Sequence, residues 1–261
     1  MPILFSNEIR YFKFDLFDPK VVNQGIFCRV GGISSEPWRS LNLGGTNGDS
    51  RANVIENRKR IFDVMDRKVE SIFDVWQVHG TDVICPDLPR PLNESHQQAD
   101  VILTDKPEIT LFMRFADCVP IFLYEPKKHV IGIVHAGWQG TVKNAVKIAV
   151  QKMITKFGCV ASDIQAGIGP SIGPDHYEVG LEVIRKARKA FRNDVDDVLI
   201  TVNGKTHFNL WKANQLNLIR EGVVSIETSE ICTACGTEDW YSHRAENGKT
   251  GRFGALLALN N

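Results

Sequence analysis

Four short apolar segments follow one another in the middle of the chain, and they constrain the fold more than any other sequence feature. They cover Val101–Thr104, Ile109–Arg114, Val119–Tyr124 and Val130–Val134. Short apolar runs of this length, separated by turn-like residues, are typical of β-strands joined by hairpin-like connections. Similar runs elsewhere predict three further strands, at Gly25–Val30, Asp74–Val78 and Ile164–Ile168.

Helical periodicity marks three other parts of the chain. Apolar residues recur at helical spacing between positions 142 and 157, and Gly158 follows as a C-terminal stop. A second helix is predicted around positions 183–191, and a third from Arg51 to Met65 with Asp49 or Ser50 as its cap. Because helices separate some strands and short connections separate others, we predict an α+β fold, a layered α/β sandwich with mixed β-sheets. The chain has no repeat or linker, so we expect residues 1–261 to form a single domain.

Position 58 interrupts the apolar stripe of the third predicted helix. An apolar residue is expected there, and the sequence has Arg58. One interpretation is that the arginine stem packs while its head reaches water. The other is that the cation points inward and serves an anionic ligand or a buried carboxylate.

Composition and charge exclude several classes of protein. Lysine plus arginine equals aspartate plus glutamate, at 31 each, whereas a nucleic-acid-binding protein usually carries a basic excess. No apolar run reaches membrane-spanning length, and Glu8 and Arg10 interrupt any signal-peptide pattern. Six irregularly spaced cysteines then indicate reduced thiols. We expect a cytoplasmic protein with a small-molecule substrate, no nucleic-acid partner and no membrane; its oligomeric state does not follow from the sequence.

Three residues with metal-binding side chains stand at the ends of predicted strands, beside glycine or turn residues. They are His79, Cys118 and His135. Side chains at strand ends commonly face a shared crevice in layered α/β proteins. Two imidazoles and one thiolate suffice to bind zinc with one coordination position open, and the same set also suits copper. We therefore predict that these three residues are both the metal ligands and the catalytic centre.

Other short motifs are weaker. The segment Gly169–Gly173 matches the G-x-S-x-G string of a nucleophile elbow, but Pro174 opposes the helix that must follow. The C-x-x-C at Cys232–Cys235 has no second cysteine pair to complete a structural zinc site. The Gly-Lys-Thr tripeptides at Gly204 and Gly248 lack the upstream glycine of a phosphate-binding loop.

A series of short motifs, in order along nearly the whole chain, forms a specific pattern. These motifs are Gly31–Ser34, Ser40–Gly44, Glu56–Arg58, Gln77–Gly80, Ala116–Cys118, His135–Trp138, Gly169–Gly173, Tyr177–Gly180, Cys232–Thr233 and Thr250–Arg252. Together they resemble the motifs of one known family, the laccase-domain family. This family is also called the multicopper polyphenol oxidoreductase family, and some members are described as purine nucleoside phosphorylases. One departure is Gln139, where many members carry an arginine that would bind an anionic co-substrate such as phosphate.

The resemblance implies a fold, a metal and an activity. It implies the fold of the catalytic domain of cytotoxic necrotizing factor, with zinc or copper bound by His79, Cys118 and His135. The implied activity is phosphorolysis of adenosine, inosine or methylthioadenosine, which yields the base and ribose 1-phosphate, together with adenosine deamination in some members. A bacterial branch is linked instead to the editing of peptidoglycan precursors.

Four further residues are candidates for contact with such a substrate. Arg58 and Arg252 are expected to contact an anion, because arginine binds phosphate through paired hydrogen bonds. Asn42 and Gln77 are expected to hydrogen-bond the ligand or to orient His79.

Three alternatives to a nucleoside-processing metalloenzyme remain open. A four-copper oxidase is disfavoured because the chain has seven histidines and no His-x-His pair, although a single copper would allow weak polyphenol oxidation. A metal-free cysteine hydrolase or amidase would use Cys118 as nucleophile and His135 as base. A non-catalytic partner-binding protein would keep the same residues without turnover.

Overall fold

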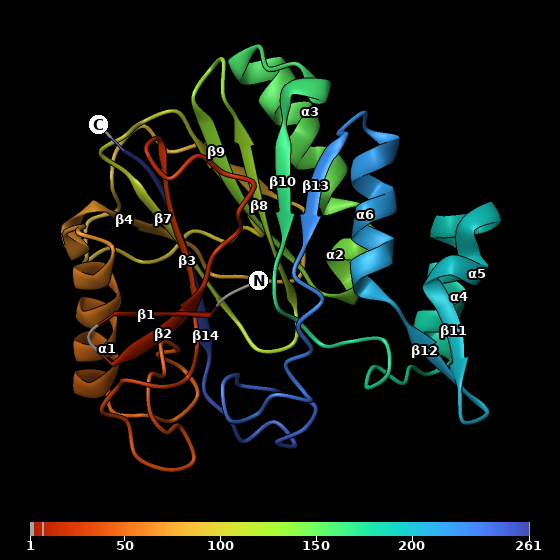
Figure 1. Cartoon of the computed structure of the whole chain (residues 1–261), viewed down its shortest axis with the longest axis horizontal. Helices are drawn as coiled ribbons and strands as arrows, with labels where there is room; N and C mark the ends of the chain where they lie inside the picture. Colours follow the sequence, from red (N-terminus) through yellow and green to blue (C-terminus); the bar gives the residue numbers. More distant parts are fainter. Residues whose placement is uncertain (1–2, 7, 261) are drawn as a thin grey trace.

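Two six-stranded sheets form the centre of the molecule (Figure 1). The computed structural model describes residues 3–6 and 8–260. The first sheet has the order β1-β2-β3-β14-β7-β4, with strands at Ile3–Ser6, Ile9–Phe12, Val22–Phe27, Phe253–Leu259, Thr110–Phe115 and Ile72–Asp74. The second has the order β13-β10-β8-β9-β6-β5, with strands at Ser225–Thr228, Gln165–Ile168, Val119–Glu125, Val130–Ala136, Val101–Thr104 and Val83–Ile84. Both sheets are mixed, since β4–β7, β10–β13 and β5–β6 are parallel and the other pairs are antiparallel.

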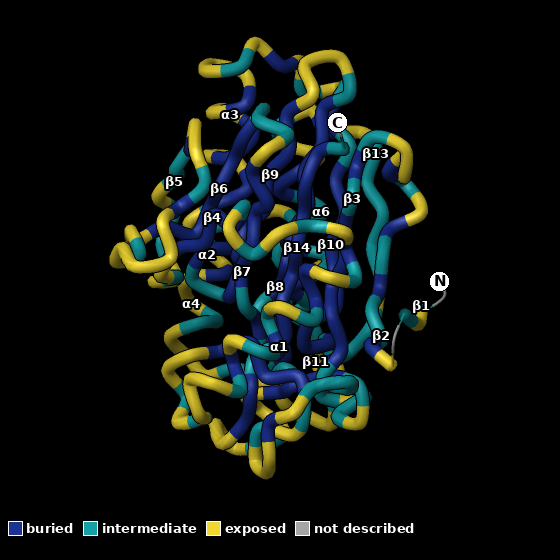
Figure 2. The backbone as a smooth tube through the Cα atoms, turned by 90° about the vertical axis from the view of Figure 1, so that its left-hand side faces the viewer, coloured by how far each residue is buried: buried dark blue, intermediate teal, exposed yellow. Residues whose placement is uncertain are grey.

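The two sheets pack face to face, and the alternation of side chains along each strand builds the layers. In β8, Phe122 and Tyr124 face the other sheet, whereas Ile121 and Leu123 face the opposite way, toward the helices. Phe14 packs edge-on against Phe122 at 5.7 Å between ring centroids, which joins the two sheets. Both faces of the central strands are therefore covered, and Figure 2 shows them as the buried centre of the molecule. This double burial explains why these strands read as continuous apolar runs in the sequence.

Helices cover the outer face of each sheet. Helix α1 (Arg51–Val64) packs Ile61 and Phe62 on the first sheet, against Phe112 of β7. The second sheet is covered by α2, α3 and α6, which span Trp138–Val142, Ala145–Phe157 and Leu210–Arg220. Beyond them lie α4 (Leu181–Phe191), α5 (Val195–Val198) and the β11–β12 hairpin at Leu199–Val202 and Lys205–Phe208 (Figure 1). Short 3-10 turns occur at Val69–Ser71, Ala161–Asp163 and Arg192–Asp194.

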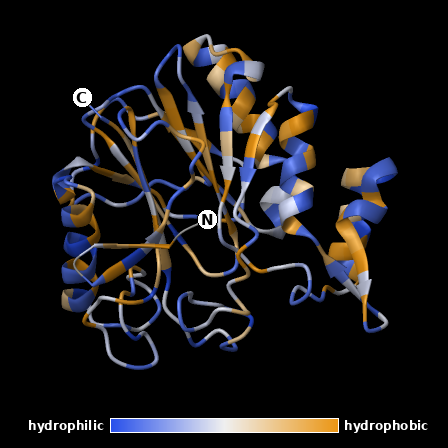
Figure 3. Cartoon of the chain, viewed as in Figure 1, coloured by the Kyte–Doolittle hydropathy of each residue, from blue (hydrophilic) through white to orange (hydrophobic). Residues whose placement is uncertain are grey.

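The order helix, sheet, sheet, helix confirms the predicted layered sandwich with mixed sheets. The hydropathy of the residues differs between the layers. The central strands are largely apolar, whereas the helices carry both polar and apolar residues (Figure 3). No helix in the described part of the chain has the length and apolar character needed to span a membrane.

Two helix boundaries predicted from the sequence agree with the structure, but the stripe between positions 142 and 157 is not one helix. Val142 ends α2, and Asn144, with a φ of 60°, separates α2 from α3. Helix α1 begins after Ser50, which occupies the N-cap position with an extended backbone. Helix α3 ends at Gly158, whose φ of 69° places it in the left-handed region that favours glycine at a helix C-terminus.

Two predicted strands were wrong in position, and several strands of the structure were not predicted. The strand predicted at Asp74–Val78 ends at Asp74, because β4 pairs with β7 only over Ile72–Asp74. The strand predicted at Gly25–Val30 lies three residues earlier, at Val22–Phe27. No strand was predicted at β1, β2 or β14, although β14 forms the middle of the first sheet. Its seven residues form a largely apolar run of the same kind as the predicted strands, so a local signal for the strand was present and overlooked. Only its pairing with partners far away in the sequence leaves no local pattern.

Candidate metal and substrate site

His79, Cys118 and His135 converge, as the sequence predicted. Each contributes a ligand atom, and these atoms all lie within 4.8 Å of one another. Cys118 immediately precedes β8 and His135 lies near the end of the adjacent β9, so the antiparallel pairing of these strands sets the two side by side. His79 reaches the same point from the loop after β4, and its ring centroid lies 5.0 Å from that of His135.

A buried carboxylate, Asp100, holds both histidines in place. Its Oδ1 lies 2.7 Å from Nδ1 of His135 and accepts a hydrogen bond from the backbone N–H of His79 at 3.0 Å. Its Oδ2 accepts from the N–H groups of Gly80 and Val78, at 2.6 and 3.2 Å. These bonds support the left-handed backbone of His79 (φ 58°), which a non-glycine residue rarely adopts. They also leave Nε2 of His135 as the ring nitrogen available to a metal or to Cys118.

Cys118 and His135 shift each other's ionisation. Burial raises the pKa of the Cys118 thiol, but His135 and His79 outweigh that effect and bring the pKa to about 6. Burial also lowers the pKa of His135, while the Cys118 thiolate and Asp100 raise it to about 9. Each group therefore favours the charged form of the other, the thiolate of Cys118 and the imidazolium of His135. The thiolate is the form of cysteine that binds metals and attacks electrophiles.

The three residues line a cavity of about 490 Å³, a size suited to a small-molecule substrate. Its lining combines aromatic and cationic side chains from both sheets and from the loops around them. The aromatic members are Trp76, Phe115, Trp138 and Tyr177, and the basic members besides the two candidate ligands are Arg114, His243, Arg244 and Arg252. The aromatic side chains suit a ligand with a flat ring, and the basic side chains suit an anionic group on that ligand or on a second ligand beside it.

Two of the four predicted substrate contacts line this cavity. Gln77 is fixed by two hydrogen bonds to the backbone of Arg114, in which its Nε2 donates and its Oε1 accepts, at 2.8 and 3.0 Å. Arg252 also lines the cavity, with Nη1 donating to the carbonyls of Thr250 and Gly251. Gln139, the position where many laccase-domain proteins carry arginine, is a further lining residue.

Asn42 lies outside the lining of the cavity in the described part of the chain. Its side chain is fully buried, and Oδ1 accepts hydrogen bonds from the N–H groups of Gly44 and Arg252. Its Nδ2 donates to Asp49 and Asn47. The contacts of Asn42 therefore join the loop at 42–49 to the start of β14, next to Arg252.

Arg58 points inward, toward a buried carboxylate. Its Nη1 lies 3.6 Å from Oδ2 of Asp74, and its side chain is 18% exposed. Asp74 is completely buried and also contacts Arg90 at 2.6 Å and His96 at 2.9 Å. Burial raises the pKa of Asp74, but these partners and Arg114 hold it well below the usual range. The structure thus selects the second interpretation of Arg58, with an internal carboxylate as its partner, and places Arg58 outside the described lining of the cavity.

Other residues of the site had no signal that we recognised in the sequence. Asp100 is a single aspartate before a strand, and Arg114 ends an apolar run, so neither breaks a periodic pattern. Arg244 lies in an irregular loop, where Nη1 donates to the carbonyl of Glu178 at 3.0 Å and the guanidinium lies 5.1 Å from the ring centroid of Tyr177. Its position depends on contacts with a loop more than sixty residues away in the sequence.

Comparison with known proteins places the chain in a family. The family described as "Multi-copper polyphenol oxidoreductase laccase" matches residues 23–260. The chain belongs to this family. The resemblance stated from the sequence motifs is thereby confirmed.

Relatives of this laccase-family chain carry names and structures that bear on its fold. Purine nucleoside phosphorylase YlmD of Bacillus subtilis (strain 168) is 34% identical over 248 residues, which cover 92% of this chain and 89% of the relative. Purine nucleoside phosphorylase YfiH of Escherichia coli (strain K12) is 30% identical, covering 92% of this chain and 95% of the relative. The crystal structure of YlmD from Geobacillus stearothermophilus matches all of both chains with a TM-score of 0.92 and 30% identity.

The family description mentions several copper ions. The groups of possible metal ligands in this laccase-family chain show whether a multi-copper cluster has a counterpart here. The described residues contain two groups of three or more side chains spaced to hold a metal ion. Neither group contains more than two histidines. A histidine-rich trinuclear copper cluster therefore has no counterpart in the described part of the chain.

Proposed function

We propose that this chain is a zinc-dependent purine nucleoside phosphorylase. The observation that carries the proposal is the convergence of His79, Cys118 and His135 at a cavity lined by aromatic rings and arginines. The names of YlmD and YfiH support the same class of reaction. The substrates would be a purine nucleoside, such as adenosine, inosine or methylthioadenosine, and phosphate, and the products would be the base and ribose 1-phosphate.

The donor atoms suit zinc. Two imidazole nitrogens and a thiolate sulfur leave one coordination position for a substrate oxygen. Asp100 orients the ring of His135 and raises the basicity of its free nitrogen, which is the usual role of a carboxylate behind a metal-binding histidine. A bound zinc ion would act as a Lewis acid that polarises an oxygen of phosphate or ribose. We propose zinc over copper because phosphorolysis transfers no electrons and zinc has no redox chemistry.

The rest of the cavity supplies the two binding regions that phosphorolysis needs. Trp76, Trp138 and Tyr177 offer flat surfaces on which a purine can stack. Arg244 and Arg252 present guanidinium groups, which match the geometry of phosphate oxygens. Holding phosphate and nucleoside together places the attacking oxygen behind the anomeric carbon and stabilises the positive charge that develops on the sugar.

A proton must reach the departing base. His243 lines the cavity and lies outside the proposed metal ligands, so we assign it as the proton donor. A histidine is suited to this step because its imidazole ring can both hold and release a proton at a ring nitrogen.

The experiment that tests this function is incubation with adenosine, with and without phosphate, followed by identification of base and sugar products. We expect adenine and ribose 1-phosphate only when phosphate is present, and no turnover by Cys118→Ala. Production of inosine at equal rates with and without phosphate would assign the chain to adenosine deamination, the second activity that the family resemblance implies. Absence of turnover on adenosine, inosine and methylthioadenosine would contradict both.

A cysteine hydrolase is a second candidate, because one specific arrangement favours it. Cys118, His135 and Asp100 lie in the order nucleophile, base and orienting carboxylate, and the pKa of Cys118 is lowered to about 6. Chelation distinguishes the two candidates. A phosphorylase of the proposed kind loses activity when zinc is removed and recovers it when zinc is restored, whereas a cysteine hydrolase survives chelation and is inactivated by iodoacetamide.

A further inference from the structure

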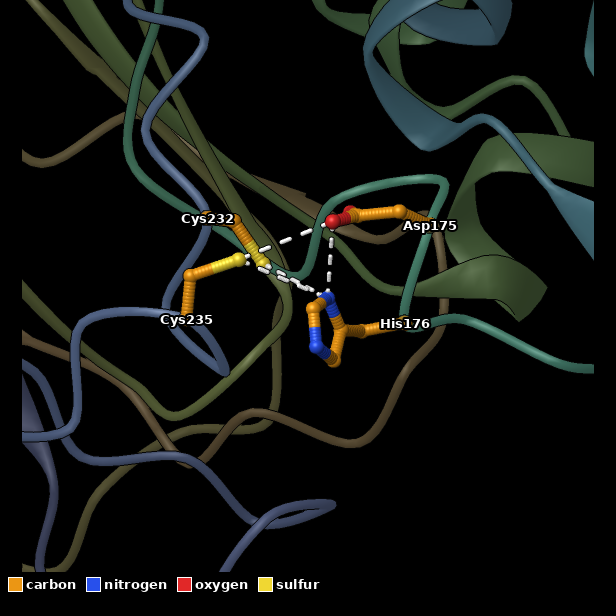
Figure 4. Close-up of side chains that lie close together, drawn as sticks. All are labelled: Asp175, His176, Cys232 and Cys235. Atoms are coloured by element: carbon orange, nitrogen blue, oxygen red, sulfur yellow. Dashed lines mark hydrogen bonds and ion pairs between the residues drawn. The ribbon is translucent and has the colours of Figure 1, made fainter.

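A second group of metal-ligand side chains lies on two loops beside the cavity (Figure 4). Asp175 and His176 come from the loop between β10 and α4, and Cys232 and Cys235 come from the loop after β13. One ligand atom from each lies within 4.8 Å of all the others, and Figure 4 shows the four side chains directed toward a common centre. We infer that these four residues form a second, structural metal site that takes zinc or a similar thiophilic divalent cation.

Four of the six distances between the ligand atoms fit a tetrahedron around zinc, and the other two are no longer than 4.8 Å. Nδ1 of His176 lies 3.8 Å from Sγ of Cys232 and 3.4 Å from Sγ of Cys235. Oδ2 of Asp175 lies 3.6 Å from Sγ of Cys235 and 3.0 Å from Nδ1 of His176. A tetrahedral zinc ion with bonds of about 2.3 Å to sulfur and about 2.0 Å to nitrogen or oxygen requires edges of about 3.5 Å to sulfur and about 3.3 Å between nitrogen and oxygen. The observed edges differ from these values by about 0.3 Å or less.

Backbone contacts hold the two loops together independently of any metal. Ser171 forms an isolated parallel bridge with Cys232, and its N–H donates to the carbonyl of Ile231 while its carbonyl accepts from Thr233. Gly173 donates its N–H to Sγ of Cys232 at 3.1 Å. The ligand group is therefore assembled by the fold itself.

Glycine at position 173 lets the backbone approach two of the proposed ligands closely. A Cβ atom there would lie 2.6 Å from Oδ1 of Asp175 and 3.0 Å from Sγ of Cys232, too near for either to stay in place. The backbone thus approaches two of the proposed ligands as closely as a residue without a side chain allows.

The donor set selects the type of metal and the role of the site. Two thiolates with an imidazole disfavour magnesium and calcium, which prefer oxygen ligands. Four protein donors close the coordination sphere of zinc, as in structural sites, whereas the three donors at His79, Cys118 and His135 leave a position open. The two groups therefore differ in the chemistry they support.

The sequence had led us to set this C-x-x-C aside, because no second cysteine pair exists. That exclusion was incomplete. The partners of Cys232 and Cys235 are an aspartate and a histidine, and His176 is 56 residues from Cys232 in the sequence. An aspartate and a histidine on a distant loop do not stand at a fixed spacing from the two cysteines, so the sequence alone does not identify them as partners.

A metal here would fix one wall of the cavity. Ile172 and Tyr177 flank the first ligand pair and line the cavity, and Arg244 donates to the carbonyl of His176 at 3.4 Å. Thr233, between the two cysteines, donates its hydroxyl to Asp117, the neighbour of Cys118. Loss of the ion is therefore expected to loosen the loop that orients Arg244, without removing any group from the first site.

The test measures metal on the full-length chain with the first site disabled, so its outcome does not depend on the proposed enzymatic function. Chains carrying Cys118→Ala are reduced, stripped with chelator, reloaded with zinc and passed through metal-free buffer. We expect about one zinc ion per chain to remain, and to be lost when Cys235→Ser is added. Cys85→Ser, which lies outside both ligand groups, is the matched control and should retain the ion.

A second readout uses the Cys118→Ala chain without either the Cys235→Ser or the Cys85→Ser replacement. Cobalt in the Cys118→Ala chain should give the intense absorption of tetrahedral thiolate coordination. Asp175 is exposed, so Asp175→Asn should fold normally. It should nevertheless lower zinc affinity by more than the roughly 10–100-fold that is lost when a residue hydrogen-bonded to a metal ligand is removed. The inference is overturned if the Cys118→Ala chain retains no zinc, or if Cys235→Ser and Cys85→Ser retain equal amounts.

Discussion

Oδ1 of Asp100 lies 2.7 Å from Nδ1 of His135, and the same carboxylate accepts hydrogen bonds from the backbone of the His79 loop. One buried side chain therefore sets the ring orientation of one candidate ligand and the backbone conformation of another. Burial raises the pKa of Asp100, but the contact with His135 and these backbone donors outweigh it and keep the carboxylate ionised. The geometry of the candidate metal centre depends on this residue as much as on the three ligands.

Replacing Asp100 tests that dependence. Asp100→Asn keeps the size of the side chain but removes its charge, and one of its two positions can no longer accept a hydrogen bond. We expect zinc affinity at the first site to fall by about 10–100-fold, as for other carboxylates behind a metal-binding histidine. Competition with a chromophoric chelator measures the change.

Asp163→Asn is the control for this experiment, because Asp163 makes a surface ion pair with Lys127 away from the cavity. Equal zinc affinity in the two variants would mean that Asp100 has no part in metal binding. Both variants are measured in the Cys235→Ser background, so that zinc at the second ligand group does not contribute.

The ionisation of Cys118 predicts its reactivity in the metal-free chain. Its pKa is lowered from 9.0 to about 6, so the thiolate predominates at neutral pH and is lost as the pH falls through about 6. Burial raises the pKa of Cys85, so that thiol stays protonated at neutral pH. Iodoacetamide at pH 7 should therefore modify Cys118 much faster than Cys85, as peptide mass analysis would show.

The pH profile of this alkylation isolates the cause. The rate at Cys118 should have its midpoint near pH 6, and His135→Gln should move the midpoint upward because the main positive partner is gone. Bound zinc should suppress the reaction. An unchanged midpoint in His135→Gln would show that His135 does not lower the pKa of Cys118.

Two arginines predicted from the sequence to contact an anion should now behave differently. Arg252 lines the cavity, so Arg252→Met should raise the KM for phosphate by about tenfold to a hundredfold, the loss of a charged hydrogen bond. Arg58 faces Asp74, so Arg58→Met should leave that KM unchanged and lower the free energy of unfolding instead. Steady-state kinetics and urea unfolding separate the two effects, and a raised KM in Arg58→Met alone would reverse the assignment.

The buried carboxylate of Asp74 should contribute to stability in a pH-dependent way. Its pKa is lowered by its cationic partners relative to the ordinary value of 3.8, so its contribution is present above that pH and is lost as the pH falls below it. Asp74→Ala leaves Arg58 and Arg90 without their partner and should cost about 3–5 kcal/mol at neutral pH.

Urea unfolding provides the measurement. It is carried out between pH 3 and pH 7, because this interval includes the ordinary aspartate pKa of about 3.9. The stability of the native chain should decline more steeply toward acid than that of Asp74→Ala. Parallel pH profiles for the two chains would show that Asp74 titrates normally.

Much of the fold was present in local patterns. The strands at Val101–Thr104 and Val130–Ala136 were found because apolar runs bounded by turn residues are a local signal, and α3 was found because its stripe and Gly158 are local as well. Two of the candidate ligands carry a related signal, because Cys118 and His135 border such runs beside a turn or a glycine. His79 was proposed from a predicted strand that ends at Asp74 in the structure.

The sequence by itself therefore determined the strands between Val101 and Ala136 and most of helices α1, α3 and α4, together with the side chains at the ends of those strands. Tertiary structure alone decided that β14 enters the first sheet, that Arg58 meets Asp74, and that His176 meets Cys232. The physical reason is that periodicity records which face of a segment is buried, but not which distant segment buries it. Partners brought together by sheet pairing and loop packing leave no mark at a fixed spacing along the chain.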